Sequence, residues 1–433
     1  MQSCITSLNN REDSKTLMQN TRKQITKDYS VRHLVVVLTL FLIFALFQFI
    51  FHQDNINGII KIFTNKDILL SDYVAIGGLG STLINATLAI GLCLIIIKRN
   101  EITVTGYVYA SVLMTAGFAF FGKNIYNVLP IYLGVYLYGR YTKTEFRRLA
   151  AMAFFSSCLA PISTIGLPYG WSGLLLSNLL NVGVGFIICA VAANIIRFHN
   201  GYLLYNFGFA AGMVAIVVIG ALRTFGMELD PVYIVSDDLH VHLVLVVLAF
   251  SISSYLLISG LLNAPFDWER YKKLLSMSGR AVTDYKSIFG EATMLVNMGA
   301  VGLIMTIVAL LLRVNFNGPI IGAILTAIGY GAFGKNPRNV LPVMAGCVIM
   351  MLLSKSPITT SQVIAILFVT GIAPIAGEYG VIVGIIAGMM HFSLVQFTSF
   401  WQGSVNLYNN GFAAGFVAGI INSVMENIRR ESE

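Results

Sequence analysis

The chain has 433 residues, of which 56% are hydrophobic and 11% are charged, and its mean hydropathy is +0.77. Because a soluble domain carries about 25% charged residues, this composition excludes an ordinary soluble protein. The formal net charge of +8 does not indicate nucleic acid as a partner, since the lysines and arginines gather in short loops and tails beside apolar runs, where they set the orientation of a membrane protein.

Apolar runs of 16 to 25 residues recur from residue 33 to residue 425, and runs of this length are typical of membrane-spanning helices. We therefore predict an all-α, polytopic transmembrane helical bundle, with the lipid bilayer as a partner. In chain order the predicted parts are a basic cytoplasmic arm at 1–32, a first span and outer loop at 33–73, a first repeat at 74–225, a linker with one span at 226–288, a second repeat at 289–425 and a cytoplasmic tail at 426–433.

Counting every apolar run as a crossing gives fourteen spans. The basic loops at 98–99, 140–148 and 270–286 then lie on the cytoplasmic side with both termini, which predicts a cell-membrane protein. Seven crossings separate each element of one repeat from its counterpart. An odd number predicts two inverted-topology repeats with a solute site where they meet, and the shortest runs, of 16 to 18 residues, indicate broken or re-entrant helices.

An eighteen-residue stretch occurs twice and identifies the repeats. GFAFFGKNIYNVLPIYLG at 117–134 and GYGAFGKNPRNVLPVMAG at 329–346 are identical at ten positions, whereas unrelated segments share roughly one. A second phrase closes each copy, LYNFGFAAG at 204–212 and LYNNGFAAG at 407–415. The offset falls from 212 to 203 residues between the two phrases, so the second copy lacks about nine residues of the first.

Each copy of the first phrase places a lysine, Lys123 or Lys335, between apolar runs. At mid-membrane a lysine costs about 2.5–3.5 kcal/mol. One interpretation is that each lysine lies at the membrane surface and sets the topology. The alternative is that the two lysines face an aqueous pathway and attract an anionic or carbonyl-bearing solute.

Four asparagines follow these lysines: Asn124, Asn127, Asn336 and Asn339. Their amides can bind a polar solute, or they can bond between helices, a contact worth about 0.6 kcal/mol on average. The second phrase adds two polar pairs, which we expect to point into a cavity: Tyr205 with Asn206, and Tyr408 with Asn409. The glycines of that phrase have the four-residue spacing of close helix packing.

Glu378 is the only acidic residue between residues 356 and 425, and the first copy has no acid at the matching place. It is a candidate site for a coupling ion or proton, or a partner of Lys335; a loop end near the interface is the alternative. The sequence contains no recognised catalytic motif and no convincing set of metal ligands. We therefore expect no enzyme activity, no metal and no cofactor.

The order of these motifs resembles that of the urea transporters. Asn336-Pro337, Tyr205-Asn206 and Tyr408-Asn409 carry the resemblance, while that family's Leu-Pro-x-x-Thr-x-Pro-Phe phrase is missing. The resemblance implies two inverted repeats, a pore in each subunit and a homo-oligomer, specifically a trimer. The chain also looks like a group of uncharacterised multi-pass bacterial membrane proteins.

Together these features predict a transporter or channel for a small polar or anionic solute, with its site between the repeats. Two other classes stay open at this point. One is an intramembrane enzyme that acts on a lipid or isoprenoid phosphate, and the other is a membrane scaffold that transports nothing.

Overall fold

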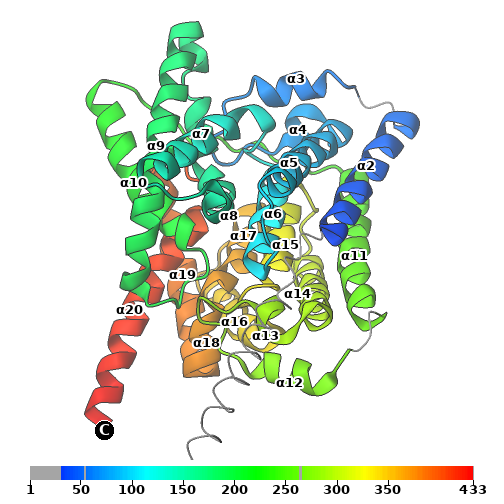
Figure 1. The fold of residues 1–433 in the computed structure, drawn as a ribbon, viewed down its shortest axis with the longest axis vertical. Coiled ribbons are helices and arrows are strands. Elements are labelled where there is room, and N and C mark those ends of the chain that lie inside the picture. The colour runs from blue at the N-terminus through cyan, green and yellow to red at the C-terminus, as the bar shows by residue number, and fades with distance from the viewer. Residues whose placement is uncertain (1–30, 53–54, 263–265, 433) are drawn as a thin grey trace, which may run out of the picture.

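The computed structural model describes residues 31–52, 55–262 and 266–432. The basic arm predicted at 1–32 therefore lies almost wholly outside the described residues. Within these ranges the chain forms helices joined by short connections, and no β-strand is present beyond isolated bridge pairs. The predicted all-α bundle is confirmed (Figure 1).

The helices fall into two series with the same order. The first series is α2 (Arg32–Phe51), α3 (Gly58–Phe63), α4 (Tyr73–Gly77), α5 (Leu79–Arg99), α6 (Gly106–Phe118), α7 (Ile125–Tyr141), α8 (Phe146–Ser156), η1 (Ser157–Ser163), η2 (Leu167–Tyr169), α9 (Gly170–His199) and α10 (Asn206–Thr224). The second series is α11 (Leu239–Leu262), α12 (Trp268–Ser276), α13 (Tyr285–Phe289), α14 (Glu291–Leu311), α15 (Gly318–Tyr330), α16 (Pro337–Leu353), α17 (Thr360–Phe368), η3 (Val369–Ile372), α18 (Ala373–Tyr379), α19 (Val381–Trp401) and α20 (Asn409–Ser432).

The repeated unit is longer than its sequence motifs. Helix α2 packs on α5, and α11 packs on α14 in the same way, although α2 and α11 share no recognisable phrase. We therefore count α2 with the first copy and α11 with the second. The extra residues of the first copy lie in α9, which has 30 residues where its counterpart α19 has 21.

The two copies run in opposite directions. Equivalent helices α6 and α15 pack against each other at the centre, where Gly117 lies beside Gly322 and Ala110 lies beside Gly329. Residue numbers rise along one helix as they fall along the other, so the pair is antiparallel and the repeats are inverted. Figure 1 agrees, because it draws α3 at the upper end of the molecule and its counterpart α12 at the lower end.

The count of fourteen full crossings is wrong. Among the described residues, nine helical segments are long and apolar enough to cross a membrane: Arg32–Phe51, Leu79–Arg99, Leu167–His199, Asn206–Thr224, Leu239–Leu262, Glu291–Leu311, Thr360–Tyr379, Val381–Trp401 and Asn409–Ile428. Helices α6 and α15 have 13 residues each, or about 20 Å, whereas the hydrocarbon core is about 30 Å thick. The repeated phrases thus form broken helices, as their short runs indicated.

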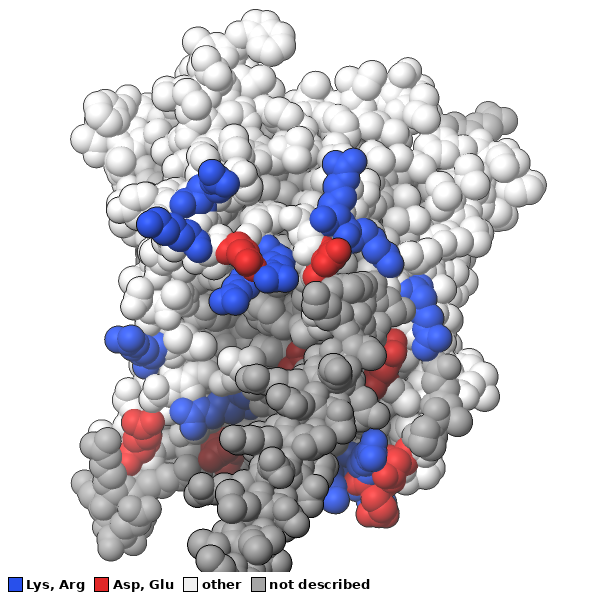
Figure 2. Space-filling view, in the orientation of Figure 1, with Lys and Arg blue, Asp and Glu red and all other residues white. Residues whose placement is uncertain are grey.

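The surface matches a membrane environment. Figure 2 shows charged side chains scattered over one face, with none along its top edge. Large apolar side chains are exposed on the long helices, among them Ile50 on α2, Trp171 and Leu176 on α9, and Val217 on α10. Exposed apolar faces on this scale are unfavourable in water and suit contact with lipid. The protein is a multi-pass membrane protein.

Candidate functional site

The site is built on the two turns that interrupt α6–α7 and α15–α16. Each turn contains a glycine with positive φ, +94° at Gly122 and +92° at Gly334. A side chain would be strained there, and a Cβ would also overlap Leu407 at the first turn or Leu204 at the second. Each turn therefore packs tightly against the other copy. The residue that follows each of these glycines is the lysine of the motif.

Both lysines are fully buried, and each meets a tyrosine from the opposite copy. The ammonium group of Lys123 donates to the Tyr408 hydroxyl and lies 4.6 Å from the centre of that ring. Lys335 donates to the Tyr205 hydroxyl and lies 4.5 Å from its ring centre. The structure thus brings four of the predicted site residues together as two Lys–Tyr pairs. Each pair crosses the interface between the copies.

Neither lysine has a carboxylate to balance its charge. Across the residues that the structure describes, no Asp or Glu oxygen lies within 4.0 Å of Lys123 or Lys335. The contacts are neutral or aromatic: Phe118 beside Lys123 at 5.3 Å, Tyr330 beside Lys335 at 5.3 Å, and the Thr370 hydroxyl at 2.7 Å from Lys335. A ring face attracts a cation, but it does not neutralise one.

The side chains of the four asparagines form hydrogen bonds with backbone groups. Asn124 caps α7 and Asn336 caps α16, and each forms a reciprocal capping box with the asparagine three residues later. The side-chain oxygens of Asn124 and Asn127 accept from each other's backbone N–H groups at 2.9 Å. This geometry favours a structural role, in which the asparagines fix the turn that carries the lysine.

A second pair of asparagines holds the lysine backbone directly. The Asn85 side chain donates to the carbonyl of Lys123 at 2.8 Å, and Asn297 donates to the carbonyl of Lys335 at 2.7 Å. Both side chains are buried on the helices that precede the motif, α5 and α14. Asn85 and Asn297 are equivalent by the 212-residue offset of the repeat, but the sequence alone does not indicate that they bind the lysine backbone.

The Tyr-Asn phrases begin α10 and α20, which meet at their first turns. Gly208 and Gly411 allow this close approach, since a Cβ on Gly208 would lie 3.0 Å from the Gly411 Cα. Asn206 is engaged by His199 at 3.0 Å, and Asn409 accepts from Gln402 at 2.8 Å. The glycines therefore have the packing role, while each asparagine also borders a cavity.

Two cavities occupy equivalent places in the two copies. The Asn409 cavity has a volume of about 250 Å³ and the Asn206 cavity about 330 Å³. Eight lining residues of the first match eight of the second by the repeat: Leu69, Leu70, Phe121, Phe368, Ser399, Leu407, Asn409 and Asn410 correspond to Ala281, Val282, Phe333, Phe155, Ile196, Leu204, Asn206 and Phe207. The inverted repeat therefore generates a pair of related cavities.

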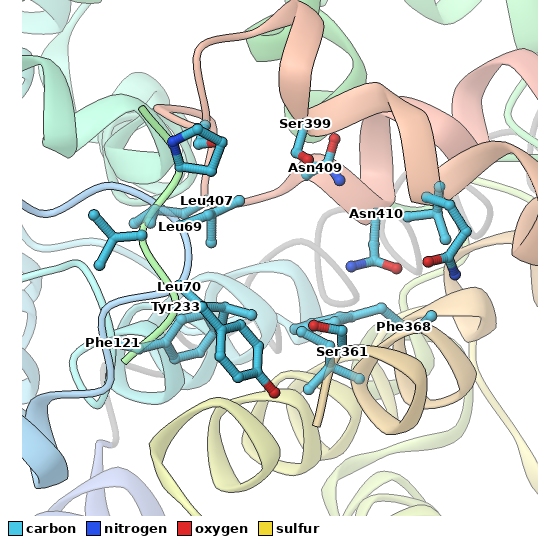
Figure 3. A pocket seen from close by; sticks show the side chains of 17 residues that line it. Leu69, Leu70, Phe121, Tyr233, Ser361, Phe368, Ser399, Leu407, Asn409 and Asn410 are labelled. Atoms are coloured by element: carbon cyan, nitrogen blue, oxygen red, sulfur yellow. The ribbon is translucent and has the colours of Figure 1, made fainter. Parts of the chain in front are cut away.

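The Asn409 cavity is the more polar of the two. Ser361, Gln396, Ser399 and Asn410 line it, and Figure 3 shows Asn410 on one side with Ser361 and Phe368 on the other. The Asn206 cavity is lined mainly by aromatic and aliphatic side chains. Amides and hydroxyls can both donate and accept hydrogen bonds, so the first cavity suits a polar molecule.

Aromatic rings separate the two cavities. From Phe121 in the Asn409 cavity, ring contacts run through Phe118, Phe368, Tyr205 and Tyr330 to Phe155 in the Asn206 cavity, with centroid separations of 4.6 to 6.1 Å. We call Phe118, Phe368, Tyr205, Tyr330 and Tyr408 the aromatic plug. Lys123 and Lys335 both pack on the plug, one from each copy.

Glu378 lies apart from this cluster. It is half-buried in the last turn of α18, and Figure 1 places α18 at the lower end of the molecule. It does not line either cavity. The role in ion coupling that the sequence suggests for it stays a prediction.

Another acidic residue, Asp67, was missed by the sequence analysis. It lies in the connection between α3 and α4, outside the nine long helices, and is fully buried. Its Oδ2 atom accepts from Asn127 at 2.9 Å and from Asn124 at 3.4 Å. Burial raises the pKa of this carboxyl to about 7, against the hydrogen bonds, which lower it. No sequence pattern distinguishes Asp67 from a loop aspartate.

Comparison with known proteins gives one match. The sequence model of the family described as "Protein of unknown function (DUF1576)" matches residues 51–224 and 266–427, well over half of the chain. Neither the curated proteins nor the solved structures contain a match, so the likeness to urea transporters gains no support. The two matched segments cover both Lys–Tyr pairs and, apart from α2 and α11, both inverted copies, and the chain therefore belongs to the DUF1576 family of multi-pass membrane proteins.

Proposed function

We propose that the protein transports a small anionic solute across the membrane, along a path between the two copies. The observation that carries this proposal is a pair of buried lysines that pack on the plug between two related cavities and meet no carboxylate among the described residues. A buried ammonium group without a counter-charge is costly. An anion that passes the plug would supply that charge at each lysine in turn.

The inverted repeat supports alternating access as the mechanism. In transporters built this way, the site lies where the repeats meet, and one repeat rocks against the other. Here each cavity ends at the same plug, so separation of the rings on one side would open one cavity toward the lysines while the other stays closed. The close glycine contacts of α6 with α15 provide the surface for such movement.

The size and lining of the cavities limit the solute. Volumes of about 250 and 330 Å³ lie just below and just above the lower end of the usual range for small-molecule sites, which is about 300–1,000 Å³. The amides and hydroxyls of the Asn409 cavity favour a solute that also accepts or donates hydrogen bonds. A small carboxylate or an inorganic oxyanion fits both conditions, with a neutral polar molecule such as urea as the alternative.

The cellular setting belongs to the same proposal. We place the protein in the cell membrane with both termini in the cytoplasm, because the basic loops that follow α5 and α7 and the basic end of α20 then all lie inside. A homo-oligomer is the remaining expectation from the sequence.

Flux into proteoliposomes tests the function. Labelled lactate, succinate, phosphate and sulfate should be offered to the wild-type protein, with labelled urea as the neutral comparator. We expect at least one anion to enter faster than into empty liposomes, and urea not to do so. Entry of urea alone would identify a path for neutral molecules and contradict the proposal of an anionic solute. If neither urea nor any of the four anions enters, transport of small anions and of urea is rejected.

The lysines can be tested in the same assay. The Lys123→Met, Lys335→Met double variant keeps the length of both side chains and removes both charges, so it should lower anion flux at least tenfold. Lys98→Met, at the exposed end of α5, is the matched control and should leave flux unchanged. A double variant that elutes as a folded protein and retains full flux would remove the lysines from the mechanism.

A further inference from the structure

Asp67 is a buried carboxylate held only by neutral groups. Besides the two amides of the α7 capping box, Asn65 donates to Oδ1 at 3.2 Å, and the Asp67 backbone N–H donates to the Thr164 hydroxyl at 3.1 Å. Within the described part of the chain, no Lys, Arg or His nitrogen lies within 4.0 Å of its oxygens. Its negative charge therefore has no direct counter-charge.

The second copy performs the same structural task without an acid. Gly279 occupies the position that corresponds to Asp67, and a Cβ there would overlap the Gly334 carbonyl. The amide of Asn339, the counterpart of Asn127, donates to the main-chain carbonyl of Ser278 at 3.1 Å. A neutral backbone oxygen is thus sufficient to complete the capping box, and support of the turn does not explain the carboxylate of the first copy.

The carboxylate lies close to both the lysine turn and the cavity. Asn127 donates one amide proton to Asp67 and another to the Gly122 carbonyl at 3.0 Å, in the residue that precedes Lys123. On the other side, Leu69 and Leu70 follow Asp67 by two and three residues and line the Asn409 cavity. The protonation state of Asp67 can therefore affect the turn that carries Lys123.

We infer that Asp67 is a proton-binding site that couples transport of the anion to the proton gradient. This inference rests on the proposed function. One proton binds to the carboxylate and cancels its charge, so a monoanion and a proton cross together with no net charge. Binding converts one carboxyl oxygen from an acceptor into a donor. The charge-assisted bond to Asn127 is thereby weakened, and the turn that holds Lys123 is loosened.

The titration of the Asp67 carboxyl can be distinguished from that of the ionisable groups around it. Tyr73 of α4 is the ionisable side chain in contact with it, and burial raises the ordinary pKa of that phenol further, so it stays neutral. Lys61 of α3, Lys66 and Lys123 are the cations of the neighbouring segments, and among the described residues none of them lies within salt-bridge distance of Asp67. Asp72, five residues along, accepts from three backbone N–H groups. Its pKa is also raised by burial to about 7.

Difference infrared spectroscopy of the protein in liposomes tests proton binding without a known solute. As the pH is lowered, wild type minus Asp67→Asn should reveal one protonated carboxyl that appears with a midpoint of about pH 7. Asp72 contributes equally to both proteins and cancels in this difference. A difference spectrum without a titrating carboxyl, or with the ordinary aspartate midpoint of about 3.9, would overturn the inference.

Coupling is tested with whichever of the labelled anions enters the wild-type liposomes. An inward proton gradient should drive accumulation in wild type and in Asp230→Asn, which removes an exposed carboxylate between α10 and α11. Asp67→Asn should accumulate no more than it does without the gradient, while it still exchanges the anion at equal pH. Retained accumulation in Asp67→Asn, or an equal loss in Asp230→Asn, would overturn the inference. If no anion enters wild type, the proposed function fails, and the infrared titration still decides whether Asp67 binds a proton.

Discussion

The two lysines occupy equivalent positions but unequal surroundings. Lys335 donates to both the Tyr205 hydroxyl and the Thr370 hydroxyl, whereas Lys123 donates to the Tyr408 hydroxyl and packs on the ring of Phe118. Because a hydrogen bond to a charged group contributes about 1.5–3 kcal/mol, the loss of one acceptor should matter more at Lys123. The repeat is thus symmetric in its backbone and asymmetric in how it holds its charges.

We predict that Tyr408→Phe is more harmful than Tyr205→Phe. Each substitution keeps the ring beneath the ammonium group and removes only the hydroxyl, and Lys335 retains Thr370 at 2.7 Å. Thermal unfolding in detergent should show the larger loss of stability for Tyr408→Phe, by about 1 kcal/mol or more. Equal losses in the two variants, or a larger one in Tyr205→Phe, would contradict the asymmetry.

The repeat identifies two lysines and two tyrosines that the structure brings together, Lys123, Lys335, Tyr205 and Tyr408. It does not indicate which of them pair, nor the other three rings of the aromatic plug. Lys123 and Tyr408 are 285 positions apart, and each belongs to a different phrase of a different copy. The motif shows that both are duplicated, yet nothing in it indicates that lysine and tyrosine pair across the copies. Asp67 could not be predicted for a different reason. Only the first copy has an acid at this position, so comparison of the two copies does not identify it.

At the scale of the elements, the antiparallel pair α6–α15 joins the two copies. Asp72 accepts from the Gly318 backbone N–H at the start of α15, and Asp284 accepts from the Tyr107 N–H at the start of α6. Each central helix has an N-cap residue of its own copy, Thr105 or Asn317, and one further N–H that an aspartate of the other copy binds. A hydrogen bond to a charged group contributes about 1.5–3 kcal/mol, and here it also makes each copy depend on the other.

The contact between these helices depends on glycine. A Cβ on Gly117 would lie 2.5 Å from the Gly322 carbonyl oxygen, which is backbone and cannot rotate away. We predict that Gly117→Ala destabilises the protein by about 1–3 kcal/mol through overpacking, measured as a lower unfolding temperature in detergent.

Gly183→Ala is the matched control for this substitution. Gly183 lies on the exposed side of α9, and a Cβ there would meet nothing within 4 Å. That variant should be neutral or gain up to about 1 kcal/mol from helix propensity. A Gly117→Ala protein as stable as Gly183→Ala would mean that α6 and α15 do not touch as described.

Hydropathy could predict the apolar segments but not their lengths as helices. The run that contains α6 continues through residues 119–121, where the structure already forms a buried turn, and this part of the turn is as apolar as a helix. Only the capping boxes at Asn124 and Asn336 show where α7 and α16 begin. For this reason the broken helices were predictable from composition, whereas the number of complete crossings was not.

At the scale of the whole molecule, the inverted repeat produces two copies of one cavity, and we expect them to face opposite sides of the membrane. Ser399 in the Asn409 cavity and Ile196 in the Asn206 cavity occupy matching positions of α19 and α9, and both are half-buried. If the repeats are inverted across the membrane, a probe confined to one side should reach only one of these positions. Because the two positions have similar surroundings, a difference in their labelling reports which side of the membrane each one faces.

We predict opposite labelling of Ser399→Cys and Ile196→Cys by a membrane-impermeant thiol reagent. The four native cysteines in the described residues are buried, but all five of the chain should be replaced first so that each variant carries a single thiol. With basic loops inside, reagent outside intact cells should modify Ser399→Cys, and Ile196→Cys should react only after the membrane is opened. Labelling of both from outside would contradict inversion across the bilayer, because equivalent positions of antiparallel repeats cannot face the same compartment.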